Sequence, residues 1–231
     1  MSKTNMKHAI KKIPFFGLII VYIYRKWINP QAPFTSSEKY WINRYNRGGN
    51  SGEGSYGQLA EFKAEIINEF VRRNMITSVI ELGCGDGNQL KLAEYPLYTG
   101  FDVSLKALSI CGEVFSNDTT KKFRVMDNYN NETADLALSL DVIFHLVEDH
   151  VFTEYMNTLF SAAEKFVIIY SSDYDENLND QPSHVKHRNF SLWIKTKMPD
   201  WKLSKYIPNQ YLFKGNTRTG SFSEFFIYEK V

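Results

Sequence analysis

The glycine-rich turn at residues 83–87 constrains the fold of this chain more than any other feature. It follows a short apolar run, and residues 79–87 together are Val-Ile-Glu-Leu-Gly-Cys-Gly-Asp-Gly. Such a run predicts a buried parallel strand, and glycine at alternate positions permits positive φ angles and leaves no Cβ in the way of a ligand. Glu81, just before the turn, favours a ligand with a cationic group, because a phosphate-binding loop presents N–H groups to an anion.

Two nucleotide-binding patterns fail on spacing. The dinucleotide fingerprint Gly-x-Gly-x-x-Gly requires a final glycine at position 88 or 90, where the chain has Asn88 and Leu90. The P-loop requires Gly-Lys-Ser/Thr at its end, and none follows the turn. An NAD-dependent oxidoreductase is therefore disfavoured.

The turn resembles motif I of class I S-adenosylmethionine-dependent methyltransferases, acid-x-Gly-x-Gly-x-Gly, in Glu81, Gly83, Gly85 and Gly87. The resemblance implies an α/β fold, with a Rossmann-like, seven-stranded, mostly parallel sheet and helices on both faces. It also implies that S-adenosylmethionine is the cofactor. We expect an N-terminal helical extension in addition.

Acids at the ends of later strands extend this resemblance. Residues 97–103 predict a second strand ending at Asp102, 21 residues after Glu81, where a carboxylate holds ribose hydroxyls in related folds. A third strand over 122–126 precedes Asp127, which the resemblance assigns to the adenine amino group. A fourth strand over 134–140 leads into Asp141-Val-Ile-Phe-His145, which resembles a segment beside the methyl-transfer centre.

These patterns give one set of candidate site residues. The cofactor-binding candidates are Glu81, Gly83, Cys84, Gly85, Gly87, Asp102, Val103, Asp127, Asn128 and Asp141. The candidate bases for an acceptor hydroxyl are His145, His184 and His187, because histidine titrates near neutrality.

Each histidine has a plainer alternative. His145 fits a satisfied histidine at the start of the helix after the fourth strand, and His184 with His187 fits a solvent-exposed pair. His184, His187 and Asp173 also suggest metal ligands, but no third ligand is fixed by spacing, so no metal is expected.

The remaining elements follow from periodicity. Leu59, Phe62, Ile66, Ile67 and Phe70 predict a helix from residue 58, with Lys63 and Glu65 on its polar side. A fifth strand is expected over 165–170 and a helix over 190–197. Strands over 201–207 and 222–229 are expected to form the antiparallel pair that closes the sheet. The long polar loop 171–189 leaves the carboxyl end of a strand, where ligands bind.

The first 28 residues differ from the rest of the chain in charge. They carry six basic residues and no acid, so residues 29–231 carry +1 − 6 = −5, a poor match for nucleic acid. Residues 13–24 are apolar, but twelve helical residues span about 18 Å, less than the roughly 30 Å of bilayer hydrocarbon. We expect a helix on an anionic membrane surface; a helix packed on the domain or at a dimer interface is the alternative.

Three segments are predicted: 1–28 as the basic-apolar helix, 29–57 as a linker and glycine-rich lid, and 58–231 as the methyltransferase domain. Two cysteines without metal spacing, Cys84 and Cys111, indicate a reduced, cytoplasmic protein. Tyr40, Trp41 and Tyr45 suit either stacking on a sugar ring or core packing. The oligomeric state is not fixed by the sequence.

The predicted function is O-methylation of a glycan or a lipid-linked sugar precursor, at the inner face of the membrane. Short basic-apolar starts of this kind resemble those of enzymes from bacterial surface-polysaccharide pathways. A small-molecule or lipid methyltransferase is the alternative. A non-catalytic S-adenosylmethionine-binding module is the alternative of another class. The predicted partners are a small-molecule or glycan methyl acceptor, and no nucleic acid.

Overall fold

The computed structural model describes residues 33–179 and 181–231. The predicted N-terminal helix over 1–28 and the first part of the predicted linker therefore lie outside the described residues. No helix in the described ranges is both long enough and apolar enough to cross a membrane.

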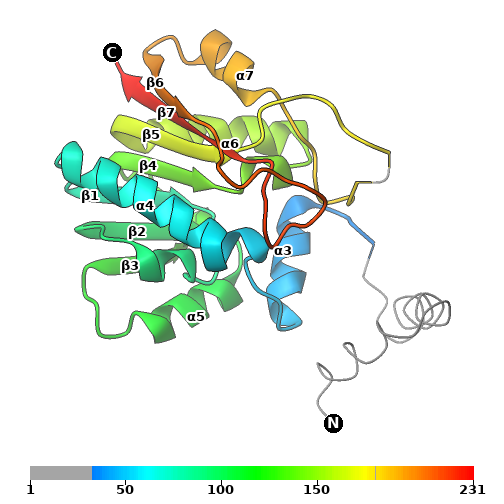
Figure 1. The fold of residues 1–231 in the computed structure, drawn as a ribbon. Helices are drawn as coiled ribbons and strands as arrows, with labels where there is room; N and C mark the ends of the chain where they lie inside the picture. Colours follow the sequence, from blue (N-terminus) through cyan, green and yellow to red (C-terminus); the bar gives the residue numbers. More distant parts are fainter. Residues whose placement is uncertain (1–32, 180) are drawn as a thin grey trace. The chain divides into compact units, whose positions relative to one another are not determined.

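The described chain alternates between strands and helices (Figure 1). The helices are α3 (Ser37–Asn46), α4 (Gly57–Arg73), α5 (Leu105–Val114), α6 (Asp149–Ser161) and α7 (Phe190–Lys197), with 3₁₀ turns η2 (Glu53–Ser55), η3 (Gln89–Leu92), η4 (Met126–Asn128) and η5 (Ile143–His145). The strands are β1 (Ser78–Leu82), β2 (Leu97–Asp102), β3 (Lys121–Val125), β4 (Ala134–Leu140), β5 (Ala163–Ser171), β6 (Trp201–Ile207) and β7 (Glu224–Lys230).

The strands form one seven-stranded sheet in the order β3-β2-β1-β4-β5-β7-β6. β1 to β5 are parallel, and β7 runs antiparallel to both β5 and β6. The predicted sheet with its antiparallel closing pair is therefore confirmed. The strand order reverses between β1 and β4, and the crevice beyond their carboxyl ends is where ligands bind in open α/β sheets.

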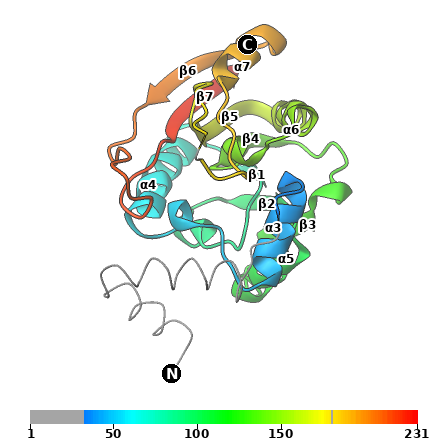
Figure 2. The ribbon, with the colours of Figure 1, turned by 90° about the vertical axis from the view of Figure 1, so that its right-hand side faces the viewer.

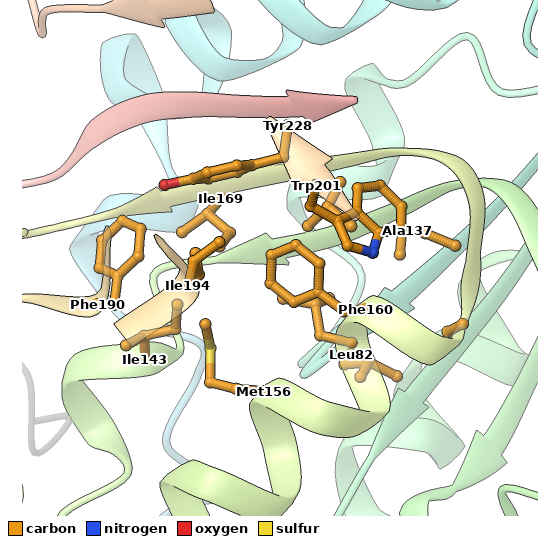
Figure 3. Close-up of a cluster of buried hydrophobic side chains, with 14 of the residues drawn as sticks. Leu82, Ala137, Ile143, Met156, Phe160, Ile169, Phe190, Ile194, Trp201 and Tyr228 are labelled. Atoms are coloured by element: carbon orange, nitrogen blue, oxygen red, sulfur yellow. The ribbon is translucent and has the colours of Figure 1, made fainter. Parts of the chain in front are cut away.

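Helices cover both faces of the sheet (Figure 2), and β1 and β4 are accordingly buried on both sides. On one face, α4 packs Phe62, Ile67 and Val71 against the sheet. On the other, α6 and α7 enclose a second cluster of aromatic and aliphatic side chains (Figure 3). Phe160 of α6 meets Trp201 of β6 edge to face, with ring centroids 5.1 Å apart. These two cores fix the strand ends rigidly.

Two local differences from the sequence predictions affect the site. The predicted linker and lid contain α3, whose N-cap Ser36 accepts a hydrogen bond from the Lys39 N–H. His145 lies in η5, and α6 begins only at Asp149, so the placement of His145 at a helix start is wrong. Residues 141–148, which include η5, separate the end of β4 from α6.

Candidate functional site

A cavity of about 140 Å³, here called the inner cavity, lies at the carboxyl ends of β1, β2 and β4. Its lining includes Glu81, Gly85, Gln89, Asp102 and Asp141 from the sheet end, and Ser37, Trp41 and Tyr45 from α3. The switch point of the sheet and α3 therefore enclose one site.

The three glycines of the turn all adopt positive φ, at 84° for Gly83, 59° for Gly85 and 73° for Gly87. A Cβ on Gly83 would lie 2.6 Å from a methyl group of Val142. A Cβ on Gly85 would collide with the hydroxyl oxygens of Ser51 and Tyr45. Glycine is thus required by the turn conformation and by the close approach of the Tyr45, Ser51 and Val142 side chains.

Asp102 ends β2 and is 8% exposed in the wall of the inner cavity. Its carboxylate accepts the Gly85 N–H at 2.9 Å and the Ser104 N–H at 2.8 Å. Burial raises its pKa to about 6. Asp102 therefore fixes the conformation of the glycine turn. Its carboxylate oxygens can also accept hydrogen bonds from a ligand in the cavity. Val103, the next residue, also lines the cavity.

Glu81 is 5% exposed and lines the same cavity. The Tyr98 hydroxyl donates to its Oε2 at 2.6 Å. Burial raises the pKa of Glu81 to about 7, against the lowering effects of Tyr98 and Lys63. A cationic ligand group in the cavity would favour the ionised carboxylate.

The hydrogen-bond acceptors that line the cavity fit a cofactor with a cationic group and several hydroxyl groups. Gln89 donates through Nε2 to the Ala60 carbonyl at 3.0 Å, and its buried Oε1 has no partner within the described residues. With the carboxylates of Glu81 and Asp102, this oxygen gives the cavity hydrogen-bond acceptors for ammonium or hydroxyl donors. Cys84, within the turn, is buried and lines the cavity.

Asp127 and Asn128 occupy η4 and are exposed. Neither lines the inner cavity, although the preceding Met126 does. The adenine role that the sequence assigned to these two residues stays a prediction.

A second cavity of about 590 Å³, here called the outer cavity, adjoins the inner one and shares Trp41, Ser51, Ser55, Asp141 and His145 with it. Its walls carry aromatic rings from α3, η5 and the segments 172–189 and 213–222. These rings are Tyr40, Trp41, Phe144, Tyr174, Phe213 and Phe222.

His145 lines both cavities. Its Nδ1 lies 3.0 Å from the carbonyl oxygen of His184. Because a carbonyl only accepts, Nδ1 carries the proton and Nε2 keeps its lone pair in the neutral ring. Burial lowers the pKa of His145 to about 4, so the ring is neutral at pH 7.

The other two histidines lie in the outer cavity. His184 stacks on Tyr40 with ring centroids 4.0 Å apart, and burial followed by the charge of Arg44 lowers its pKa to about 4. His187 is buried, with Nδ1 2.6 Å from the Ser172 hydroxyl. The structure therefore brings all three candidate bases to one region, and only His145 adjoins both cavities.

Sequence reasoning placed Lys63 on the polar side of α4, and this was wrong. Its side chain is 1% exposed, and Nζ lies 2.7 Å from Oδ2 of Asp141. The Ser223 hydroxyl donates to the other oxygen of Asp141 at 2.7 Å, and Asp141 itself has φ 59°. The sequence did indicate this burial, because residues 59, 63 and 67 are spaced by four and share the buried face of the helix.

Asp86 was also missed as a site residue. Its carboxylate accepts the Ser51 N–H at 3.0 Å, the Ser51 hydroxyl at 2.8 Å and the Tyr56 hydroxyl at 3.0 Å. The glycine-rich segment 48–57 is thereby tied to the glycine turn. An acid inside the turn, with no partner nearby in sequence, was the available signal.

The described residues contain no group of three or more His, Cys, Asp or Glu arranged to hold a metal ion. The His184 ring stacks on Tyr40, and the His187 ring contacts the hydroxyl groups of Ser172 and Tyr174.

Comparisons with known proteins identify the domain. Residues 80–182 match the family described as "Methyltransferase domain". The comparison with curated proteins found no match.

Solved structures share the fold. Magnesium protoporphyrin IX methyltransferase from Synechocystis PCC 6803, with bound S-adenosylmethionine, is 14% identical, with a TM-score of 0.62 over 87% of this chain and 100% of that one. The N-methyltransferase NodS from Bradyrhizobium japonicum WM9, in complex with S-adenosyl-L-homocysteine, is 11% identical, with a TM-score of 0.60 over 82% and 98%. Residues 80–182 are thus a methyltransferase domain, and motif I together with this fold indicates S-adenosylmethionine as its cofactor.

Proposed function

We propose that this methyltransferase O-methylates a glycan or a lipid-linked sugar precursor. The acceptor ring would occupy the outer cavity, and His145 would take the proton of the reacting hydroxyl. The observation that carries the proposal is the position of His145 in the lining of both cavities, with its Nε2 lone pair free of the His184 carbonyl.

The aromatic walls support a ring-shaped acceptor. Tyr40 and Trp41 come from α3, Phe144 from η5, and Tyr174 and Phe222 from later loops. Aromatic faces pack well against apolar C–H surfaces, while the hydroxyl groups of a sugar find polar atoms at the cavity edges.

The chain's own residues have distinct parts in the reaction. S-Adenosylmethionine, when bound, supplies a methyl carbon attached to a positively charged sulfur. His145 Nε2 would take the proton of the acceptor hydroxyl as that oxygen receives the methyl group. The burial that keeps His145 neutral at pH 7 leaves this lone pair available. Trp41 and Tyr45 help to exclude water from the inner cavity.

The cofactor roles are part of the proposal. Asp102 would hold the ribose hydroxyls, Glu81 would face the amino group, and Asp127 with Asn128 would contact adenine. Gly83, Gly85 and Gly87 would let the backbone approach the methionine portion. The segment 29–57, which includes α3, would act as the lid.

The N-terminal sequence supports a location for this reaction. Its basic and apolar residues over 1–28 suit contact with the anionic inner face of a membrane, where lipid-linked sugars of surface-polysaccharide pathways are found. A small-molecule or lipid acceptor is the alternative substrate. The carboxylates that line the inner cavity argue against a non-catalytic binding module, since a protein that has lost its activity usually loses its cofactor-binding residues first.

Transfer of a labelled methyl group from S-adenosylmethionine tests the proposal on nucleotide sugars, lipid-linked glycans, phenols and lipids. Methylation of a sugar hydroxyl is expected, and His145→Asn should lower kcat by about 10²–10⁴-fold with cofactor affinity unchanged. His150→Asn, an exposed histidine of α6, is the control. Methylation of phenols or lipids alone would contradict the glycan assignment, and full activity of His145→Asn would remove its role.

A further inference from the structure

We propose that Arg44 forms an anion-binding subsite in the outer cavity, so that the acceptor carries a carboxylate or a phosphate. The inference rests on the proposed function only in taking the outer cavity as the acceptor site. Arg44 lines this cavity together with Tyr40 and Trp41. The three residues share one face of α3, because they are spaced by three and four.

The hydrogen bonds of Arg44 leave its charge uncompensated. Nε donates to the Asn50 carbonyl at 2.6 Å, Nη2 to the Asn50 side-chain oxygen at 3.3 Å, and Nη1 to the Tyr40 hydroxyl at 3.4 Å. All three acceptors are neutral, and a guanidinium has five N–H donors. Two N–H groups therefore remain for a ligand, and Arg44 belongs to no ion pair within residues 33–179 and 181–231.

The carboxylates of the outer cavity do not neutralise the positive charge of Arg44. Asp141 is paired with Lys63 at 2.7 Å, and Glu53 is paired with Arg218 at 3.2 Å. Glu176 is exposed to solvent, where water and salt screen it.

The guanidinium is also held in a fixed position. Its Cζ lies 5.5 Å from the centroid of the Trp41 ring, and Asn50 takes two of its donors. A planar, pre-positioned guanidinium matches a carboxylate or a phosphate through two parallel hydrogen bonds. The nearby neutral rings of His145 and His184 add no second cation at pH 7.

A matched set of sugars tests the subsite. Dissociation constants of glucose, glucuronate and glucose 6-phosphate are measured by ligand-detected NMR on the full chain with S-adenosyl-L-homocysteine present. Benzamide and benzoate form a second pair without a sugar. We expect at least one anion to bind about tenfold more tightly than its neutral partner. Glucuronate and glucose 6-phosphate distinguish a carboxylate from a phosphate.

Three variants test whether the preference depends on Arg44. Arg44→Gln should abolish it, Arg44→Lys should recover part of it, and Arg47→Gln, an exposed arginine beside the same helix, should leave it unchanged. Affinity for S-adenosyl-L-homocysteine, measured on each variant, reports that the domain is folded. Should Arg44→Gln not fold, Arg44→Lys carries the comparison through its partial loss.

The outcomes separate the two proposals. Equal binding of anion and neutral partner in both pairs, or a preference that survives Arg44→Gln, would overturn the subsite. A preference for benzoate that depends on Arg44, with no sugar bound, would support the subsite and contradict the glycan acceptor.

Discussion

Lys63 shows how one buried charge holds the switch point together. Its ammonium group is enclosed between α4 and the ends of β1 and β4, and it neutralises Asp141. Lys63→Met should lower the free energy of unfolding by about 1–3 kcal/mol, because Asp141, whose side chain is 17% exposed, then loses its counter-charge. Chemical denaturation measures this, with Lys106→Met on the exposed face of α5 as the control. A loss below about 1 kcal/mol would show that the pair does not stabilise the fold.

Glu81 gives a pH-dependent prediction. Its pKa is raised from 4.5 in the unfolded chain to about 7 in the fold, so the folded state binds the proton more tightly. Glu81 therefore stabilises the fold below about pH 4.5, and this contribution is lost as the pH rises to about 7.

Glu81→Gln has no such titration. Relative to the unmodified protein, its free energy of unfolding should rise by about 3 kcal/mol between pH 4.5 and 8. Urea denaturation of both proteins across this range isolates Glu81, because the histidines contribute equally to each. A flat difference between the two proteins would refute the raised pKa of the buried Glu81 carboxyl.

The segment from α3 to η2 is held to the glycine turn by polar contacts rather than by a large apolar face. The Ser37 hydroxyl and N–H both donate to Glu148, and Ser51 donates twice to Asp86. Few of the residues of α3 are buried, so its stability depends on these partners.

Asp86→Ala should release this segment. Amide hydrogen exchange over 50–56 is expected to accelerate, and affinity for S-adenosylmethionine to fall about tenfold, because the inner cavity loses one wall. Glu113→Ala, an exposed acid of α5, should change neither measurement. Unchanged exchange over 50–56 would show that Asp86 does not tether the segment.

The helices and strands of the sheet domain were predictable from the sequence. The polar contacts that hold the segment from α3 to η2 were not. β4, β6 and α7 have the predicted bounds because apolar runs and periodicity determine them locally. α3 was missed because its sequence lies between prolines and glycines and its first residue, Ser37, is held by distant Glu148. The inward position of Lys63 was missed because polarity, rather than its four-residue spacing, was used to orient it.

The described unit, from Ser36 to Val231, contains every residue of both cavities. A chain that lacks residues 1–28 should therefore keep cofactor affinity and lose binding to anionic lipid vesicles. Vesicle sedimentation, with neutral vesicles as the control, measures the second property. Retained vesicle binding would contradict the membrane role of this segment, and an insoluble truncation would favour a helix that packs on protein.

Calorimetric titration of the full chain with S-adenosylmethionine and S-adenosyl-L-homocysteine, with NAD as the control, tests the central claim most directly. We predict binding of the first two alone. Asp102→Ala should weaken that binding by about 1.5–3 kcal/mol, the contribution of a hydrogen bond to a charged group. Unchanged affinity in Asp102→Ala would remove its ribose role. Binding of NAD, or of none of the three, would contradict the assignment of this cavity to S-adenosylmethionine.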